Sequence, residues 1–64
     1  MSLIAEALYR LEERAGIMEY DGESSREEAE AGAIEELEAD EDFGPGVKRA
    51  AIRLFRERIA RERR

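Results

Sequence analysis

The chain has 64 residues, of which 44% are charged and 42% hydrophobic, and its formal net charge is −6. It lacks cysteine, histidine and tryptophan, which excludes disulfide frameworks, zinc fingers and catalysis by Ser-His-Asp or Cys-His groups. A chain of this size buries only about 60% of the surface that its unfolded form exposes. We therefore expect one domain, residues 1–64, built from well-formed helices or completed by a partner.

The first predicted helix covers residues 2–20, with Ser2 as the expected N-cap. Its apolar residues recur at alternating spacings of four and three and therefore share one face: Ile4, Leu8, Leu11, Ala15 and Met18, flanked by Leu3, Ala7 and Ile17. Gly16 lies beside this face, and we expect another helix to cross closely there. The Asp21-Gly22 pair ends the helix, because glycine readily adopts the left-handed conformation of a helix terminus.

The second predicted helix covers residues 25–40 and begins in one of two overlapping capping boxes, Ser24 with Glu27 or Ser25 with Glu28. Its apolar face is thin and consists mostly of small side chains: Ala29, Ala33 and Leu37, flanked by Ile34. Alanines let a neighbouring helix approach closely but bury little area each. We therefore expect the neighbouring helices to hold this one in place.

The third predicted helix covers residues 46–62 and follows the break Gly44-Pro45-Gly46, which cannot continue the second helix. Phe43 precedes the break, and we expect it to fold back over the end of the core; the alternative is an exposed Phe that binds a partner. The apolar residues of this helix form a wide arc: Val47, Ala50, Ala51, Leu54 and Phe55, extended by Ile52 and Ile59. Part of this arc is expected to face something other than the first two helices.

Together these patterns predict an all-α three-helix unit with helices at about 2–20, 25–40 and 46–62. A homodimer through the first or the third helix would complete it, because the apolar area exceeds what one small bundle buries. The predicted core contains Ile4, Leu8, Leu11, Ala15, Met18, Ala33, Leu37, Val47, Ala51, Leu54 and Phe55.

Charge is unevenly distributed along the chain. Residues 1–18 carry a net charge of −1, residues 19–45 carry −11 and residues 46–64 carry +6. One interpretation is internal: the acidic middle and the basic end lie side by side, in exposed pairs that add about 0 to 1 kcal/mol each. The other interpretation is that one of the two patches faces outward and binds a partner.

Two alternative binding surfaces follow from this segregation. An acidic second helix would engage a basic partner, such as a nucleic-acid-binding protein, by standing in for phosphates; its candidate residues are Glu27, Glu28, Glu30, Glu35, Glu36, Glu38, Asp40 and Asp42. Alternatively, the third helix would neutralise the phosphates of a nucleic acid, with binding that weakens as salt rises; its candidate residues are Lys48, Arg49, Arg53, Arg56 and Arg58.

Catalysis, a cofactor and a metal site are not expected. The acidic run that begins at Asp40 fails as a calcium loop, because Ala51 occupies the twelfth position, where an EF-hand needs a glutamate. No apolar run approaches the roughly 18 residues of a membrane span, and the first residues lack the basic and apolar regions of a signal peptide. We therefore expect a cytoplasmic, non-enzymatic protein that does not engage membranes.

A helix–turn–helix pattern covers residues 14–30, reading Arg-Ala-Gly-Ile-Met-Glu-Tyr-Asp-Gly at 14–22 and Ser-Arg-Glu-Glu-Ala-Glu at 25–30. It resembles short segments of phage-, plasmid- and integrative-element-encoded proteins, often near the ends of replication or primase-like polypeptides. The resemblance implies a mobile-element origin. In size and acidity the chain is also similar to anti-CRISPR proteins, which block a host nucleoprotein complex. We therefore expect a non-catalytic protein-binding inhibitor of that kind, with a nucleic-acid-binding accessory protein as the alternative.

Overall fold

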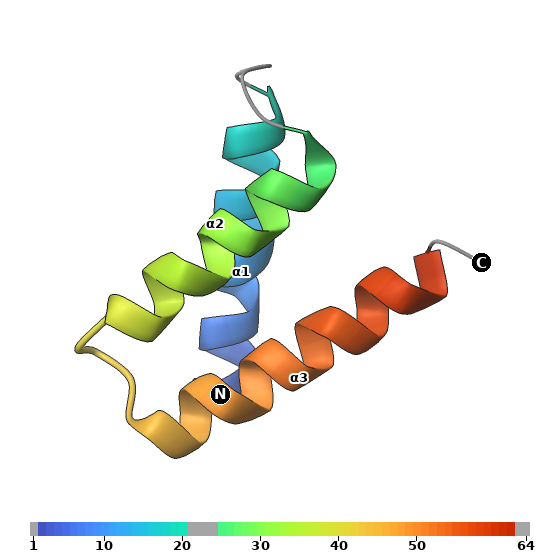
Figure 1. Ribbon diagram of the computed structural model, residues 1–64. Coiled ribbons are helices and arrows are strands. Elements are labelled where there is room, and N and C mark those ends of the chain that lie inside the picture. Colours follow the sequence, from blue (N-terminus) through green and yellow to red (C-terminus); the bar gives the residue numbers. More distant parts are fainter. Residues whose placement is uncertain (1, 21–24, 63–64) are drawn as a thin grey trace.

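A computed structural model describes residues 2–20 and 25–62, which form three helices and, within these ranges, no strand. Helix α1 spans Leu3–Tyr20, α2 spans Arg26–Ala39 and α3 spans Pro45–Glu62. Figure 1 shows α2 and α3 diverging from the turn that joins them, and α1 packs against both. The prediction of an all-α three-helix unit is confirmed, and the helix boundaries lie within one residue of the expected ones.

Serine side chains cap the first two helices as the sequence predicts. The N–H group of Ala5 donates to Oγ of Ser2 over 3.1 Å, and that of Glu28 donates to Oγ of Ser25 over 3.2 Å. Of the two overlapping capping boxes, α2 therefore uses the one that begins at Ser25. The other signals predicted between the first two helices lie outside the described residues: Asp21, Gly22 and Ser24.

Small side chains from all three helices meet in the core. The buried residues are Ala7, Leu11, Ala29, Ala33, Leu37, Phe43, Ala51 and Phe55. The alanines let the helix backbones approach one another, so the two leucines and the two phenylalanines supply most of the buried apolar volume. Phe43 is 5% exposed and belongs to the same cluster, which confirms that it folds back over the core.

Leu54 is 42% exposed, so its predicted place in the core is wrong. Ala51 and Phe55 are the buried residues of α3. The apolar arc of this helix is wider than the surface that α1 covers, and Leu54 lies at one edge of the arc. Helix α2 does not cover the rest, because it contacts α3 little. The remaining predicted core residues are partly buried: Leu8, Ala15 and Val47 pack against the core, and Ile4 and Met18 are of intermediate exposure.

The close helix approach expected at Gly16 is absent from the described structure, because a Cβ atom at this position would meet no atom within 4 Å. The close approach is instead at Gly32 of α2, where an added Cβ would lie 3.0 Å from Sδ of Met18. Helices α1 and α2 therefore meet through Gly32 and the core alanines, and Gly16 faces open space.

The two leucines Leu11 and Leu54 provide a matched test of this core. Leu11→Ala should lower the free energy of unfolding by roughly 3 kcal/mol, because it leaves a cavity in a site with no exposed surface. Leu54→Ala should cost less than about 1 kcal/mol, because much of that side chain already contacts water. Urea titrations followed by circular dichroism measure both. Equal costs for the two substitutions would contradict the assignment of Leu54 to the surface.

Gly16→Ala should raise the free energy of unfolding by about 0.5 to 1 kcal/mol. Alanine restricts the unfolded chain and favours the helix, and the added methyl group meets no neighbour. Thermal melts of the variant and of the wild-type protein measure the gain. Gly32→Ala is the comparison, because its methyl group must displace the Met18 side chain; a larger gain there than at Gly16 would argue against the packing described above.

Candidate protein-interaction surface

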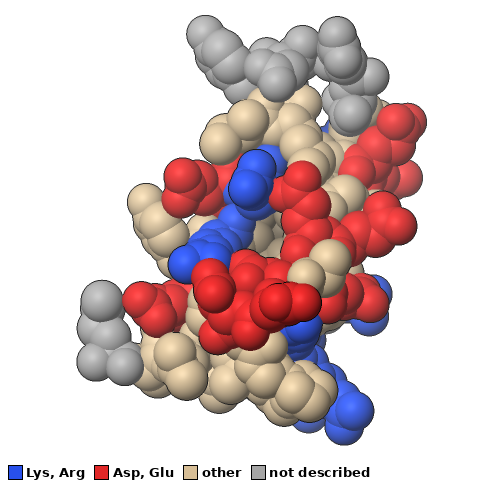
Figure 2. Space-filling model, turned by 90° about the vertical axis from the view of Figure 1, so that its left-hand side faces the viewer, with Lys and Arg blue, Asp and Glu red and all other residues tan. Residues whose placement is uncertain are grey.

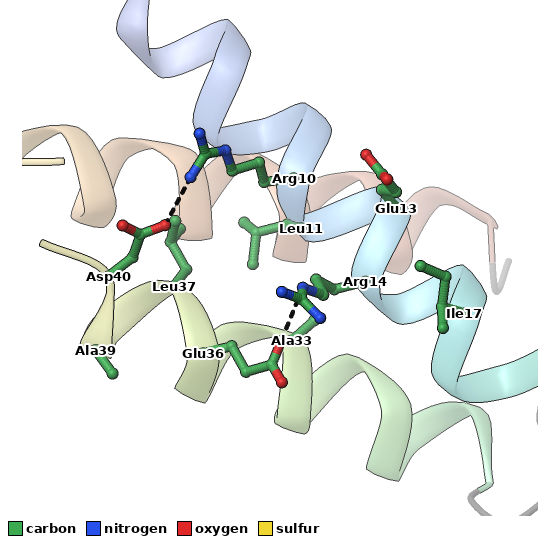
Figure 3. A pocket seen from close by; sticks show the side chains of 10 residues that line it. All are labelled: Arg10, Leu11, Glu13, Arg14, Ile17, Ala33, Glu36, Leu37, Ala39 and Asp40. Carbon is green, nitrogen blue, oxygen red and sulfur yellow. Dashed lines mark hydrogen bonds and ion pairs between the residues drawn. The ribbon is translucent and has the colours of Figure 1, made fainter. Parts of the chain in front are cut away.

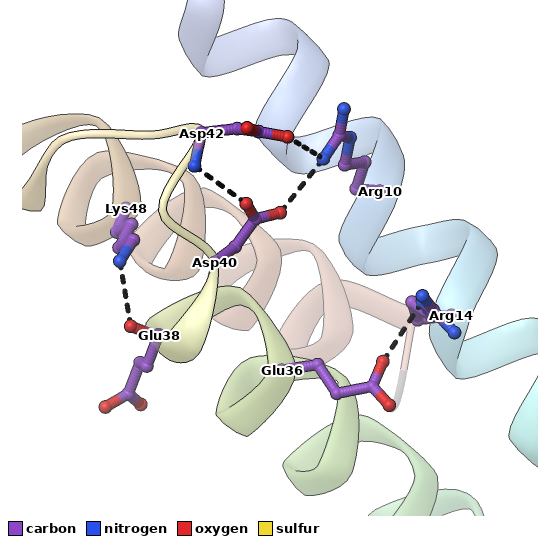
Figure 4. Close-up of polar contacts among 7 residues, drawn as sticks. All are labelled: Arg10, Arg14, Glu36, Glu38, Asp40, Asp42 and Lys48. Carbon is purple, nitrogen blue, oxygen red and sulfur yellow. Dashed lines mark hydrogen bonds and ion pairs between the residues drawn. The ribbon is translucent and has the colours of Figure 1, made fainter.

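The acidic residues of α2 and the following turn form two rows, and the inner row faces α1. Nε of Arg14 lies 3.0 Å from a carboxylate oxygen of Glu36, and NH1 of Arg10 lies 2.9 Å from Asp40 and 3.3 Å from Asp42. Figure 4 shows both arginines reaching from α1 to these carboxylates. Three of the predicted partner-binding residues are thus engaged within the chain.

These ion pairs span a groove between α1 and α2 (Figure 3). Its floor contains the buried side chains of Leu11, Ala33 and Leu37. Arg10 and Arg14 cross it from α1 and end on carboxylates of the opposite helix. The inner acidic row therefore fastens α1 to α2 and is a structural feature of the fold.

Arg10 also holds the turn between α2 and α3. Its guanidinium carbon lies 5.0 Å from the ring centroid of Phe43, within cation–π range. The N–H group of Asp42 donates to a carboxylate oxygen of Asp40 over 2.9 Å. That hydrogen bond, followed by the contact with Arg10, outweighs partial desolvation and lowers the pKa of Asp40 below its ordinary value. Arg10 thus contacts both the carboxylates of the turn and the ring of Phe43, which covers the end of the core.

The outer acidic row consists of Glu28, Glu35 and Glu38, which are all exposed. Their spacings of seven and three residues place them on one side of α2. None of their carboxylates forms an ion pair with any described residue. Lys48 of α3 donates over 2.8 Å to the backbone carbonyl of Glu38, and Figure 4 shows the Glu38 carboxylate pointing away from that contact. This row remains available to another molecule.

The other two predicted acidic residues, Glu27 and Glu30, differ in exposure. Glu27 is exposed, whereas only 13% of the Glu30 side chain is accessible and its carboxylate lies 3.9 Å from Nε of Arg26. Arg26 also pairs with Glu62 of α3 over 3.1 Å. This pair joins α2 to α3: Arg26 is the one base of residues 19–45, and Glu62 is an acid of the basic residues 46–64.

The predicted basic residues of α3 also divide into engaged and available groups. Arg58 forms an ion pair with Glu12 of α1 and thereby fastens α3 to α1. Arg49, Arg53 and Arg56 are exposed and, at spacings of four and three, share one side of α3. A within-helix pair over 3.6 Å joins Arg53 to Glu57, whereas the other two guanidinium groups form no ion pair with a described residue.

The surface seen from the turn end reflects this division (Figure 2). Acidic side chains gather over α2 and the turn, with basic side chains of α1 set among them, and further basic side chains lie below along α3. The ion pairs of Glu36, Asp40 and Asp42 therefore run to α1 rather than to the basic helix that follows α2 in sequence.

Arg10 and Arg14 are the residues that sequence reasoning missed. A signal for them exists: they are four residues apart and flank the predicted apolar face of the first helix, where long basic side chains commonly reach a neighbouring helix. The identity of the neighbour does not follow from that pattern.

No family model, curated protein or solved structure matches this chain. Within residues 2–20 and 25–62, no helix combines the length and the apolar character that crossing a bilayer requires. The acidic residues in these ranges form no cluster of three or more that could hold a metal ion.

Asp40→Asn tests the contribution of the Asp40 charge at the turn. The substitution removes the charge, but asparagine can still accept the hydrogen bond from Asp42. The folded-state pKa of Asp40 lies below that of the unfolded chain, so ionised Asp40 stabilises the fold at neutral pH, and this contribution is lost as pH falls below about 4. The variant should melt below the wild-type protein at about pH 7, and the gap should close toward about pH 2.

Glu41→Gln is the control for this measurement, because it neutralises an adjacent exposed carboxylate that forms no ion pair with a described residue. It should melt with the wild-type protein at neutral pH. A gap between Asp40→Asn and wild type that stays constant across the acid range would show that the charge of Asp40 does not stabilise the fold.

Proposed function

We propose that this protein is a non-catalytic, cytoplasmic binding module that uses α2 to engage a basic surface of another protein. The observation that carries the proposal is the outer row of Glu28, Glu35 and Glu38, whose exposed carboxylates pair with no described residue. A basic partner would neutralise them without breaking any ion pair of the fold.

The rigidity of α2 supports this function. Its buried alanines and the contacts of Arg10 and Arg14 fix the helix on α1, so little ordering is needed when a partner binds. From Glu28 to Glu38 the outer row extends about 15 Å along the helix axis, at 1.5 Å per residue. Charges presented in this way increase the association rate and select a complementary partner.

A band of negative charge along one side of a helix suits a protein surface that ordinarily holds phosphates. We therefore assign the partner to the nucleic-acid-binding surface of a host nucleoprotein complex, which this protein would inhibit by occupying it. The resemblance of residues 14–30 to phage- and plasmid-encoded segments, and the similarity to anti-CRISPR proteins in size and acidity, are consistent with that role.

A second candidate function is nucleic-acid binding by α3. The observation that favours it is the exposed row of Arg49, Arg53 and Arg56, which would neutralise phosphates. The outer row of α2 opposes it, because those carboxylates lie on the neighbouring helix and repel the same phosphates. We therefore rank it second.

Affinity capture from a lysate of the host organism, followed by titration of the purified captured protein, tests the first function. Glu35→Gln/Glu38→Gln should weaken the measured Kd at least about tenfold, or about 1.4 kcal/mol, because two charges that face the partner are lost. Glu6→Gln/Glu13→Gln is the matched control: it removes two exposed charges from α1 and should leave the Kd unchanged.

A salt-titrated gel shift with duplex and single-stranded DNA separates the two candidates. Low-micromolar DNA binding that weakens with salt and disappears in Arg49→Glu/Arg56→Glu would establish the second function. Equal Kd values for the two glutamine variants and the wild-type protein would overturn the first. Arg58 and Glu36 are unsuitable positions for this comparison, because each fastens α1 to another helix.

A further inference from the structure

An open groove lies between α2 and α3, and isoleucine side chains form its floor. Ile34 of α2 and Ile52 and Ile59 of α3 are each only partly buried. They line two adjoining hollows of about 500 and 620 Å³, which share Glu38 and Arg56. The groove thus has an apolar floor that the three helices of one chain cover only in part.

The two walls of this groove carry opposite charge. Glu35 and Glu38 line the α2 side, and Arg49, Arg53 and Arg56 line the α3 side. Glu35 and Glu38 do not neutralise these arginines, because no ion pair joins either glutamate to a described residue of α3. The divergence of α2 and α3 from their common turn (Figure 1) accounts for this separation.

We propose that a second copy of this chain docks in the groove and forms a two-fold symmetric dimer. A two-fold axis running along the groove places α2 of each copy opposite α3 of the other. The acidic wall then meets the basic wall twice, and the isoleucine floors meet between them. A partner of one charge sign that filled the whole groove would match one wall and be repelled by the other, whereas a second copy matches both.

The net charge of the chain does not prevent this association. Each copy carries −6, but at physiological salt the Debye length is about 8 Å, which screens the repulsion between distant charges far more than the attraction between charges in contact. The arginine stems add apolar cover to the isoleucines. Since Glu35 and Glu38 also belong to the surface of the proposed function, a second copy and a basic partner would compete for them.

Sedimentation equilibrium of the wild-type protein at about 0.15 M salt, over roughly 10 to 500 µM, tests the dimer through its concentration dependence. The wild-type protein should shift from monomer to dimer across this range. Arg49→Glu/Arg56→Glu and Glu35→Arg/Glu38→Arg should each weaken the dimer at least about tenfold, because like charges then face each other at both contacts. Circular dichroism melts verify that each variant is folded.

Mixing the two double variants in equal amounts should restore dimers, since the reversed α3 of one then meets the reversed α2 of the other. Both variants keep a net negative charge, so net attraction does not explain such a result. Combining all four substitutions in one chain restores the net charge of −6 and should restore self-association. Glu6→Arg/Glu13→Arg, which changes charge equally on α1, should dimerise as the wild-type protein does.

A wild-type protein that stays monomeric throughout would overturn the proposal, as would double variants that dimerise normally or a mixture that fails to associate. These outcomes are separable from the proposed function. Capture of a basic partner by monomeric Arg49→Glu/Arg56→Glu tests the acidic row without the dimer, and a failed capture leaves the sedimentation result standing.

Discussion

Two arginines of α1 determine which carboxylates of the acidic segment remain exposed to partners. Arg10 and Arg14 approach α2 from its inner side and engage Glu36, Asp40 and Asp42. Exposed ion pairs contribute about 0 to 1 kcal/mol each, so the buried face of Ala29, Ala33 and Leu37 orients α2 and the two arginines select which carboxylates are paired. The opposite side of α2 then presents its glutamates to solvent.

The composition of the core explains why the fold is open on one side. Half of the buried side chains are alanines, which permit close helix contacts but cover little area. Helix α1 can contact both neighbours, whereas α2 and α3 contact each other little. Ile34, Ile52 and Ile59 are consequently left half-covered beside the core. An outward apolar groove is therefore a direct result of a core built from small residues.

Sequence periodicity was sufficient to predict the three helices, the serine caps and the buried Phe43, because these depend on local spacing and on turn residues. It was insufficient for Leu54 and Gly16. A wide apolar arc shows which residues can be buried, but the packing angle of the neighbouring helix decides which of them are. The same limit applies to Arg10: its position beside an apolar face was visible, yet its partners depend on how α1 and α2 align.

The unequal pairing of charge connects the two proposals. Had α2 and α3 packed along their whole lengths, Glu35 and Glu38 would lie against Arg49 and Arg56, and these charges would be paired within the chain. Because the helices diverge, these glutamates and arginines do not pair with each other. Both rows can therefore form ion pairs with another molecule. A net charge of −6 therefore describes this protein less well than the separation of its two outward rows, which any partner must match in both sign and position.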